Sequence, residues 1–171
     1  ETNTASGPVT AVGGGYLNTA IGHGSTVAGG ERNIAGGINS AVAGGNGNTA
    51  NGDYSFVVGR LAKNSDPLHD GVFMFADSLN VDFFSAGANT FNVRAQGGAH
   101  FNAQTSLFFG AQTRQMLNLW NAPAIDNYGI GVQANTLYFR TGNHFAWFRD
   151  GIHNDNMFNP GSGGTEIMRL D

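Results

Sequence analysis

Small apolar and polar residues alternate along the first third of the chain in a pattern that repeats with a period of 15, as at Asn18, Asn33 and Asn48. Each copy has two halves of similar form, Asn-x-Ala-x-Gly and Ser-x-Val-x-Gly, and a weaker copy begins at Asn3. A flexible glycine-rich linker is the alternative, but a linker does not keep Val and Ala in register. The repeated positions are Asn18, Gly22, Ser25, Val27, Gly29, Asn33, Gly37, Ser40, Val42, Gly44, Asn48, Gly52, Ser55, Val57 and Gly59.

The repeat predicts short β-strands that form a stack of narrow coils. Ala and Val recur with the period of 2 that a strand with one buried face requires. The glycines suit corners where the backbone passes close to a neighbour or takes a positive φ. Two short strands per repeat make one coil, and stacked coils form a parallel β-solenoid with identical residues in columns. The Asn and Ser columns are expected to hydrogen-bond to neighbouring coils or to turn backbone.

The pattern changes from about residue 70 to alternating runs that are rich in aromatic residues. Twelve of the 13 Phe residues and both Trp residues lie after residue 60. These runs predict strands separated by Gly, Asn and Asp turns, and GVFMFADS (71–78) is predicted to be a buried strand. We therefore predict an all-β chain with a β-roll over 1–61, a transition segment over 62–88 and a C-terminal β-strand module over 89–171.

Composition narrows the classes of function. Charged residues make up 12% of the chain and the net charge is −4, which gives no reason to expect binding to nucleic acid. There is no cysteine, and no apolar run approaches the length of a membrane-spanning segment. Coils filled by Ala and Val bury little apolar surface, so association of identical copies is expected to supply the missing burial.

The repeats over residues 1–59 resemble the parallel β-roll head of YadA-like trimeric autotransporter adhesins. The segments AKNSDPLHDGVFMFADS (62–78) and NTFNVRAQGGAHF (89–101) are similar to segments that follow such rolls in bacterial surface and phage tail-fibre-like proteins. TEIMRLD (165–171) looks like the lead-in to an endosialidase-type intramolecular chaperone domain. The resemblance implies a homotrimeric extracellular fibre on a bacterial surface or a phage-like particle, which attaches to a glycan or protein receptor and folds with a chaperone that is later removed.

The acidic residues give little indication of catalysis. A glycoside hydrolase needs two carboxyl groups about 5 to 9.5 Å apart, and most of the Asp residues here lie beside Gly, Asn or Pro in turn-like contexts. We therefore expect no enzyme activity and no cofactor. A glycan-depolymerising tailspike fragment and a purely architectural spacer remain as alternatives.

Two clusters combine Asp and His in the way that divalent cation sites do. Solvated turns are the alternative interpretation of both. The candidate metal ligands are Asp66, His69 and Asp70 in the first cluster, and Asp150, His153 and Asp155 in the second.

Aromatic and arginine side chains after residue 110 are candidates for a glycan-binding site, because rings stack on sugars and arginines pair with acidic groups. The alternatives are core packing for the rings and, for arginines such as Arg94, ion pairs with Asp between chains. The candidate residues are Trp120, Tyr128, Tyr138, Arg140, Trp147 and Arg149.

Overall fold

A computed structural model describes residues 2–100, 114–121, 127–134, 136–140, 145–150 and 162–170. The chain divides into two compact units, Glu1–Phe101 and Asn102–Asp171. The described residues form strands and turns without any helix, which confirms the predicted all-β class. It follows that no helix in the described part of the chain is long and apolar enough to cross a membrane.

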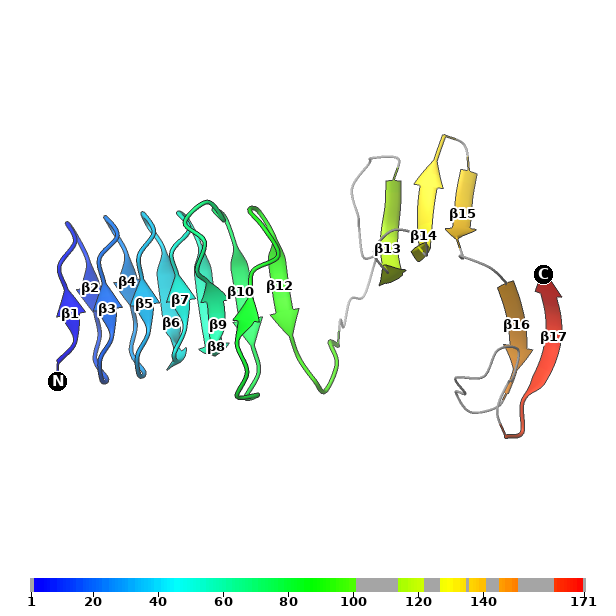
Figure 1. The fold of residues 1–171 in the computed structure, drawn as a ribbon, viewed down its shortest axis with the longest axis horizontal. Helices are drawn as coiled ribbons and strands as arrows, with labels where there is room; N and C mark the ends of the chain where they lie inside the picture. Colours follow the sequence, from blue (N-terminus) through cyan, green and yellow to red (C-terminus); the bar gives the residue numbers. More distant parts are fainter. Residues whose placement is uncertain are drawn as a thin grey trace. The chain divides into compact units, whose positions relative to one another are not determined.

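The first unit is a parallel β-solenoid of about six turns, built from two six-stranded parallel sheets (Figure 1). Successive strands alternate between the sheets, so each coil contributes one strand to each. Sheet A contains β1 (Thr4–Ala5), β3 (Thr19–Ala20), β5 (Ile34–Ala35), β7 (Thr49–Ala50), β9 (Ala62–Asn64) and β11 (Phe83–Phe84). Sheet B contains β2 (Ala11–Val12), β4 (Thr26–Val27), β6 (Ala41–Asn46), β8 (Phe56–Arg60), β10 (Phe73–Ala76) and β12 (Phe91–Arg94).

The strand register confirms the predicted coil length. Residues one repeat apart are direct partners, as Ala20 is with Ala35 and Val27 with Val42. Identical residues therefore lie in columns along the solenoid. The column residues Ala20, Val27, Ala35, Val42, Ala50 and Val57 are all buried.

The Asn column of the repeat has the predicted role, and the Ser column has it in part, because Ser25 Oγ donates to the Ala35 carbonyl whereas Ser40 Oγ has no hydrogen-bond partner among the described residues. The Asn and Ser of each repeat are buried between the two sheets. Asn18 Oδ1 accepts a hydrogen bond from the backbone N–H of Asn33, and Asn33 Oδ1 accepts one from the backbone N–H of Asn48. This ladder links each coil to the next through a side chain that is shielded from water.

At the corners of the coils, some residues lie very close to the backbone of the next coil and others have positive φ. The sequence did not show which residues do which. A side chain on Gly22, Gly37 or Gly52 would overlap the backbone of the following coil. Positive φ occurs instead two residues later, at Gly24 (69°), Asn39 (51°) and Tyr54 (56°). The glycine of the Asn half-repeat is thus required for close packing, and the left-handed position after it accepts other residues, whereas in the Ser half-repeat Gly44 (134°) and Gly59 (110°) have positive φ themselves.

The solenoid continues beyond the last sequence repeat. Phe56 pairs with Phe73, and Phe73 pairs with Phe91, so the last coils are longer than the repeat. Residues 62–94, which the sequence analysis divided between a transition segment and the C-terminal module, thus add strands to both sheets. The extra residues of the longer coils lie in the turns, so the pairing of the strands is preserved.

One prediction for this region was wrong. GVFMFADS was predicted to be buried, but β10 buries only alternate residues, Met74 and Ala76. Phe73 and Phe75 are 40% and 38% exposed. The cause is that β10 has the core on one face only, so its other face points outward.

The second unit is antiparallel where it is described. One sheet has the order β13-β14-β15, and β16 pairs with β17. Phe139 and Phe145, from different sheets of this unit, meet edge to face with their ring centroids 6.0 Å apart. The strands are β13 (Arg114–Asn121), β14 (Asn127–Gln133), β15 (Thr136–Arg140), β16 (Phe145–Arg149) and β17 (Thr165–Leu170).

Candidate functional site

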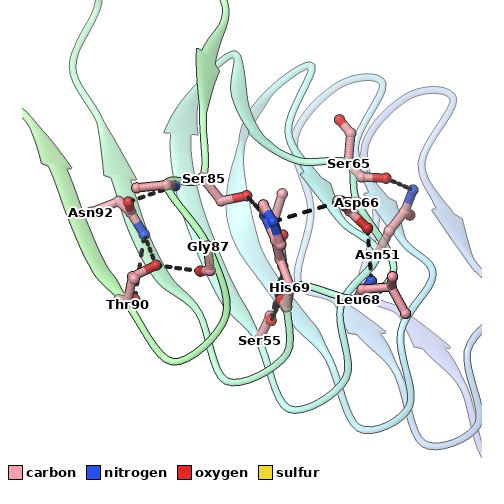
Figure 2. Close-up of polar contacts among 12 residues, drawn as sticks. Asn51, Ser55, Ser65, Asp66, Leu68, His69, Ser85, Gly87, Thr90 and Asn92 are labelled. Carbon is pink, nitrogen blue, oxygen red and sulfur yellow. Dashed lines mark hydrogen bonds and ion pairs between the residues drawn. The ribbon is translucent and has the colours of Figure 1, made fainter. Parts of the chain in front are cut away.

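The Asp66–His69 turn contains a polar network that joins two levels of the solenoid. His69 Nδ1 lies 2.8 Å from Ser85 Oγ, and His69 Nε2 lies 3.6 Å from Asp66 Oδ2 (Figure 2). Ser85 Oγ in turn donates to Asn64 Oδ1 at 3.1 Å. Sequence reasoning identified Asp66 and His69 from the Asp/His cluster but missed Ser85 and Asn64, because neither is a typical metal ligand and Ser85 is distant in the sequence.

The directions of these hydrogen bonds determine what the network can do. Asn64 is fully buried, and its Nδ2 donates to Ser55 Oγ and to the His69 carbonyl. The single hydroxyl proton of Ser85 is directed at Asn64 Oδ1, so Ser85 Oγ accepts from His69 Nδ1. A nucleophilic serine requires the opposite direction, with the histidine accepting the hydroxyl proton. In this geometry the Asp–His–Ser arrangement stabilises the turn and does not activate Ser85.

Asp70, the third residue of the first predicted metal cluster, has a different partner. Its Oδ1 accepts the backbone N–H of Asp53 at 2.8 Å, and Asp53 Oδ1 accepts the N–H of Ile38 at 2.7 Å. These two carboxylates form a ladder along one corner of the solenoid. Asp53 was not predicted to take part, although it lies one coil before Asp70.

The predicted metal sites gain no support from the geometry. No group of three or more His, Asp or Glu residues is placed to hold a metal ion in the described ranges. In the second cluster Asp150 is exposed and has a φ of 57°, while His153 and Asp155 lie outside the described residues.

Arg94 pairs with an aspartate of its own chain. Its Nε donates to Asp77 Oδ1 at 2.8 Å, and both side chains are less than one-fifth exposed. The guanidinium also donates to the carbonyls of Arg60 and Leu79, and lies 5.4 Å from the centroid of the Phe83 ring. Arg94 therefore fastens the last coil and is not available to an acidic ligand.

The charge of Asp77 is stabilised by several donors. The backbone N–H of Gln96 donates to its Oδ2 at 2.9 Å, and this bond is the main cause that lowers the pKa of the carboxyl below its ordinary value. Desolvation opposes the effect, while Arg94 and the N–H of Leu79 add to it. The carboxylate is thus ionised at neutral pH and holds three segments of the last coil together.

The six candidate glycan-binding residues are divided between two sheets of the second unit. Trp120 pairs with Tyr128 across β13 and β14, while Tyr138 and Arg140 pair with the glycines at 131 and 129. The side chains of these four residues lie outside the described part. Trp147 and Arg149, in contrast, are both exposed and lie two residues apart on β16.

Trp147 and Arg149 are the candidate ligand-binding pair that the described geometry supports best. Trp147 is 40% exposed, and the centroid of its ring lies 4.6 Å from that of Phe145, which contacts one side of it. A supported, half-exposed indole with a cation on the same strand suits a sugar ring that carries an acidic substituent.

The chain matches no protein-family model and no curated protein. The structure supports a parallel β-solenoid for residues 1–59, and no family is shown for this part of the chain.

Proposed function

We propose that this chain is a non-catalytic structural segment of a homotrimeric extracellular fibre, which serves attachment to a surface glycan or protein receptor. The observation that carries the proposal is a solenoid with a thin core and a large apolar exterior. Among the described residues of the solenoid, 14 large apolar side chains are exposed, whereas ten apolar residues form its core and five of those are Ala.

This balance favours self-association. A core of Ala and Val contributes little at about 25 cal/mol per Å² of buried apolar surface. Exposed apolar surface on this scale marks sites of protein association. Packing of identical copies about an axis buries such surface without any other partner.

The number of copies and the biological setting come from the resemblance of the repeats to trimeric adhesin heads. On that basis the fibre belongs to a bacterial surface or a phage-like particle. The same resemblance supports folding with a C-terminal chaperone domain that is removed afterwards.

The mass of the purified chain in solution tests the assembly. Light scattering is expected to give three copies of the 17.9 kDa chain, about 54 kDa. A mass of 17.9 kDa over a wide range of concentrations would contradict the proposal.

Binding tests the role in attachment. The intact chain is expected to bind some members of an array of bacterial surface polysaccharides or whole cells, and to leave the polysaccharides at their original length. Absence of binding in every case would favour an architectural spacer, and shortened polysaccharide chains would favour a depolymerase.

A further inference from the structure

Six apolar residues form a continuous patch on the outer face of sheet B, at the last three strands. We call this patch the apolar grid. It has two columns of three residues, because outward residues two apart on each strand pair with their counterparts on the next. The grid consists of Phe56 and Val58 on β8, Phe73 and Phe75 on β10, and Phe91 and Val93 on β12.

The rings of one column are stacked in regular order. Phe56 and Phe73 have ring centroids 5.4 Å apart with an interplanar angle of 11°. Phe73 and Phe91 have centroids 4.9 Å apart at 16°. The spacing follows the rise of one coil, so the column is a straight ridge with a period of about 5 Å.

The grid is exposed and carries no charge. The fraction exposed is 39% for Phe56, 40% for Phe73 and 68% for Phe91. Phe75 and Val93 are also more than one-third exposed. Covering the grid therefore removes apolar surface from water without any cost of desolvating a charged group.

The other outer surfaces of the solenoid differ from the grid. On sheet B the same column continues toward the N-terminus with the small residues Ala41, Thr26 and Ala11. On sheet A the corresponding column runs from Ile34, which is 39% exposed, through the buried Thr49 to the charged Lys63 and then Phe84. The grid is thus the largest uncharged aromatic surface among the described residues of this unit.

We propose that the grids of neighbouring copies of this chain face one another around the symmetry axis of the assembly. This inference rests on the proposed self-association and adds the surface through which it takes place. An identical solenoid presents a ridge of the same period, so the rings of neighbouring copies meet level by level along the axis. A partner without this period would leave gaps in the contact.

The exposed area of the grid is smaller than that of a stable interface between two copies. We therefore infer that the contact surface extends beyond the grid along sheet B. At about 200 Å² for a whole Phe side chain, the exposed parts of the four Phe rings offer roughly 400 Å². A stable interface buries about 800 Å² per partner. The grid supplies about half of this area, and the small residues of β2, β4 and β6 provide a smooth continuation of the same face.

A matched pair of variants tests the proposal in the full chain. Phe91 and Phe84 belong to the last coil and are 68% and 62% exposed, but they lie on sheets B and A respectively. Phe91→Glu is expected to reduce the mass by light scattering about threefold, from that of the trimer to that of one chain, because it places three carboxylates together at the axis. Phe84→Glu is expected to retain the mass of the trimer.

A second measurement does not require the protein to accept a new charged side chain at position 91 or 84. The chain has no cysteine, so Phe91→Cys and Phe84→Cys can each be labelled with pyrene maleimide. Excimer emission is expected from the label at 91 and not from the label at 84. Amide hydrogen exchange in β8 and β10 of each variant establishes that the solenoid is intact.

The possible outcomes separate the two proposals. If the unmodified chain is oligomeric and Phe91→Glu remains so with the solenoid intact, or if excimer emission comes from position 84, the grid is not the contact surface and the fibre proposal stands. Loss of association in both glutamate variants also contradicts a contact confined to sheet B. If the unmodified chain is a single copy, the fibre proposal fails, and the inference fails with it.

Discussion

At the scale of single residues, the solenoid depends on side chains that satisfy backbone groups inside a narrow core. Asn33 shows this most clearly, because its Nδ2 donates to the carbonyls of Gly29 and Gly45 and its Oδ1 accepts from Asn48. A hydrophobic residue of similar size would fill the same space but remove all three bonds, and of these backbone groups the Gly45 carbonyl would keep the N–H of Glu31.

Replacement of Asn33 by Ala is expected to lower the free energy of unfolding by about 3 kcal/mol, because several buried polar groups lose their partner at once. Asn51 provides the control, since its Nδ2 makes a surface bond to the Ser65 carbonyl at 3.2 Å. Asn51→Ala is expected to cost less than about 1 kcal/mol. Equal losses of unfolding free energy in the two variants, measured by urea denaturation, would show that the buried Asn ladder stabilises the protein no more than a surface hydrogen bond does.

The repeated glycines also differ in whether a larger side chain would fit at their position. A methyl group on Gly37 would overlap the carbonyl oxygen of Gly52 in the next coil, whereas on Gly29 the nearest atom would be 3.9 Å away. Gly37→Ala is expected to cost about 4 kcal/mol or to prevent folding, and Gly29→Ala to change stability by less than about 1 kcal/mol. Thermal melting followed by circular dichroism measures both effects. A Gly37→Ala variant as stable as the unmodified chain would contradict the close approach of the coils.

At the scale of elements, the coils tolerate unequal turns as long as the strands stay paired. The connection from β10 to β11 shows how a longer turn is held in place. Asp77 accepts from Arg94 Nε and from the N–H of Gln96, and Arg94 Nη1 donates to the Val81 carbonyl at 2.5 Å. One ion pair thus fixes the turn and the last strand together.

The lowered pKa of Asp77 predicts how the stability of this coil depends on pH. A carboxyl group whose pKa is lowered by folding stabilises the protein above its ordinary pKa of about 3.9, and the contribution is lost as the pH falls through the lowered value. The difference in melting temperature between the unmodified chain and Asp77→Asn is therefore expected to be constant from pH 7 to about pH 5 and to shrink below about pH 4.

Asp82, which is exposed in the same turn, provides the control for this measurement. Asp82→Asn is expected to leave the melting temperature nearly unchanged at pH 7. Hydrogen exchange of the β12 amides localises the effect of Asp77→Asn to the last coil. A difference in melting temperature that does not vary with pH would show that the charge of Asp77 is not responsible.

At the scale of the whole molecule, we expect the two units to divide self-association and ligand recognition between them. The solenoid has hydrogen-bonded Asn columns inside and an apolar patch on its outer face, which suits a rod that associates with copies of itself. The second unit presents Trp147 and Arg149 at its surface, which suits recognition. This division belongs to the proposed function.

Trp147→Ala is expected to weaken binding to the polysaccharides that the intact chain retains on an array by roughly tenfold, because exposed anchoring rings provide a large share of binding energy. Arg149→Ala is expected to weaken binding mainly to acidic polysaccharides. Leu137, which is 64% exposed on β15, serves as a control, and Leu137→Ala is expected to retain binding. Unchanged affinity in both the Trp147 and the Arg149 variants would place the receptor site elsewhere.

The sequence by itself determined the coil length, the inward residues and the Asn ladder of residues 18 to 57, whereas a register shift in β6 pairs Gly59 with Gly45 and not with Gly44. The physical reason is that stacking of identical coils translates a linear repeat directly into columns, so the pattern contains the register. The same reasoning could not extend to residues 62–94, where longer turns break the period although the strands still pair.

Only the tertiary structure decided the partners of individual polar groups and the position of the aromatic rings. Asp70 bonds to Asp53 and Arg94 to Asp77 because corners and turns bring together residues that have no pattern in common. The Phe residues of β8, β10 and β12 lie on the outer face because the thin core has room for only one side of each strand, and that side is occupied by residues such as Val57 and Met74.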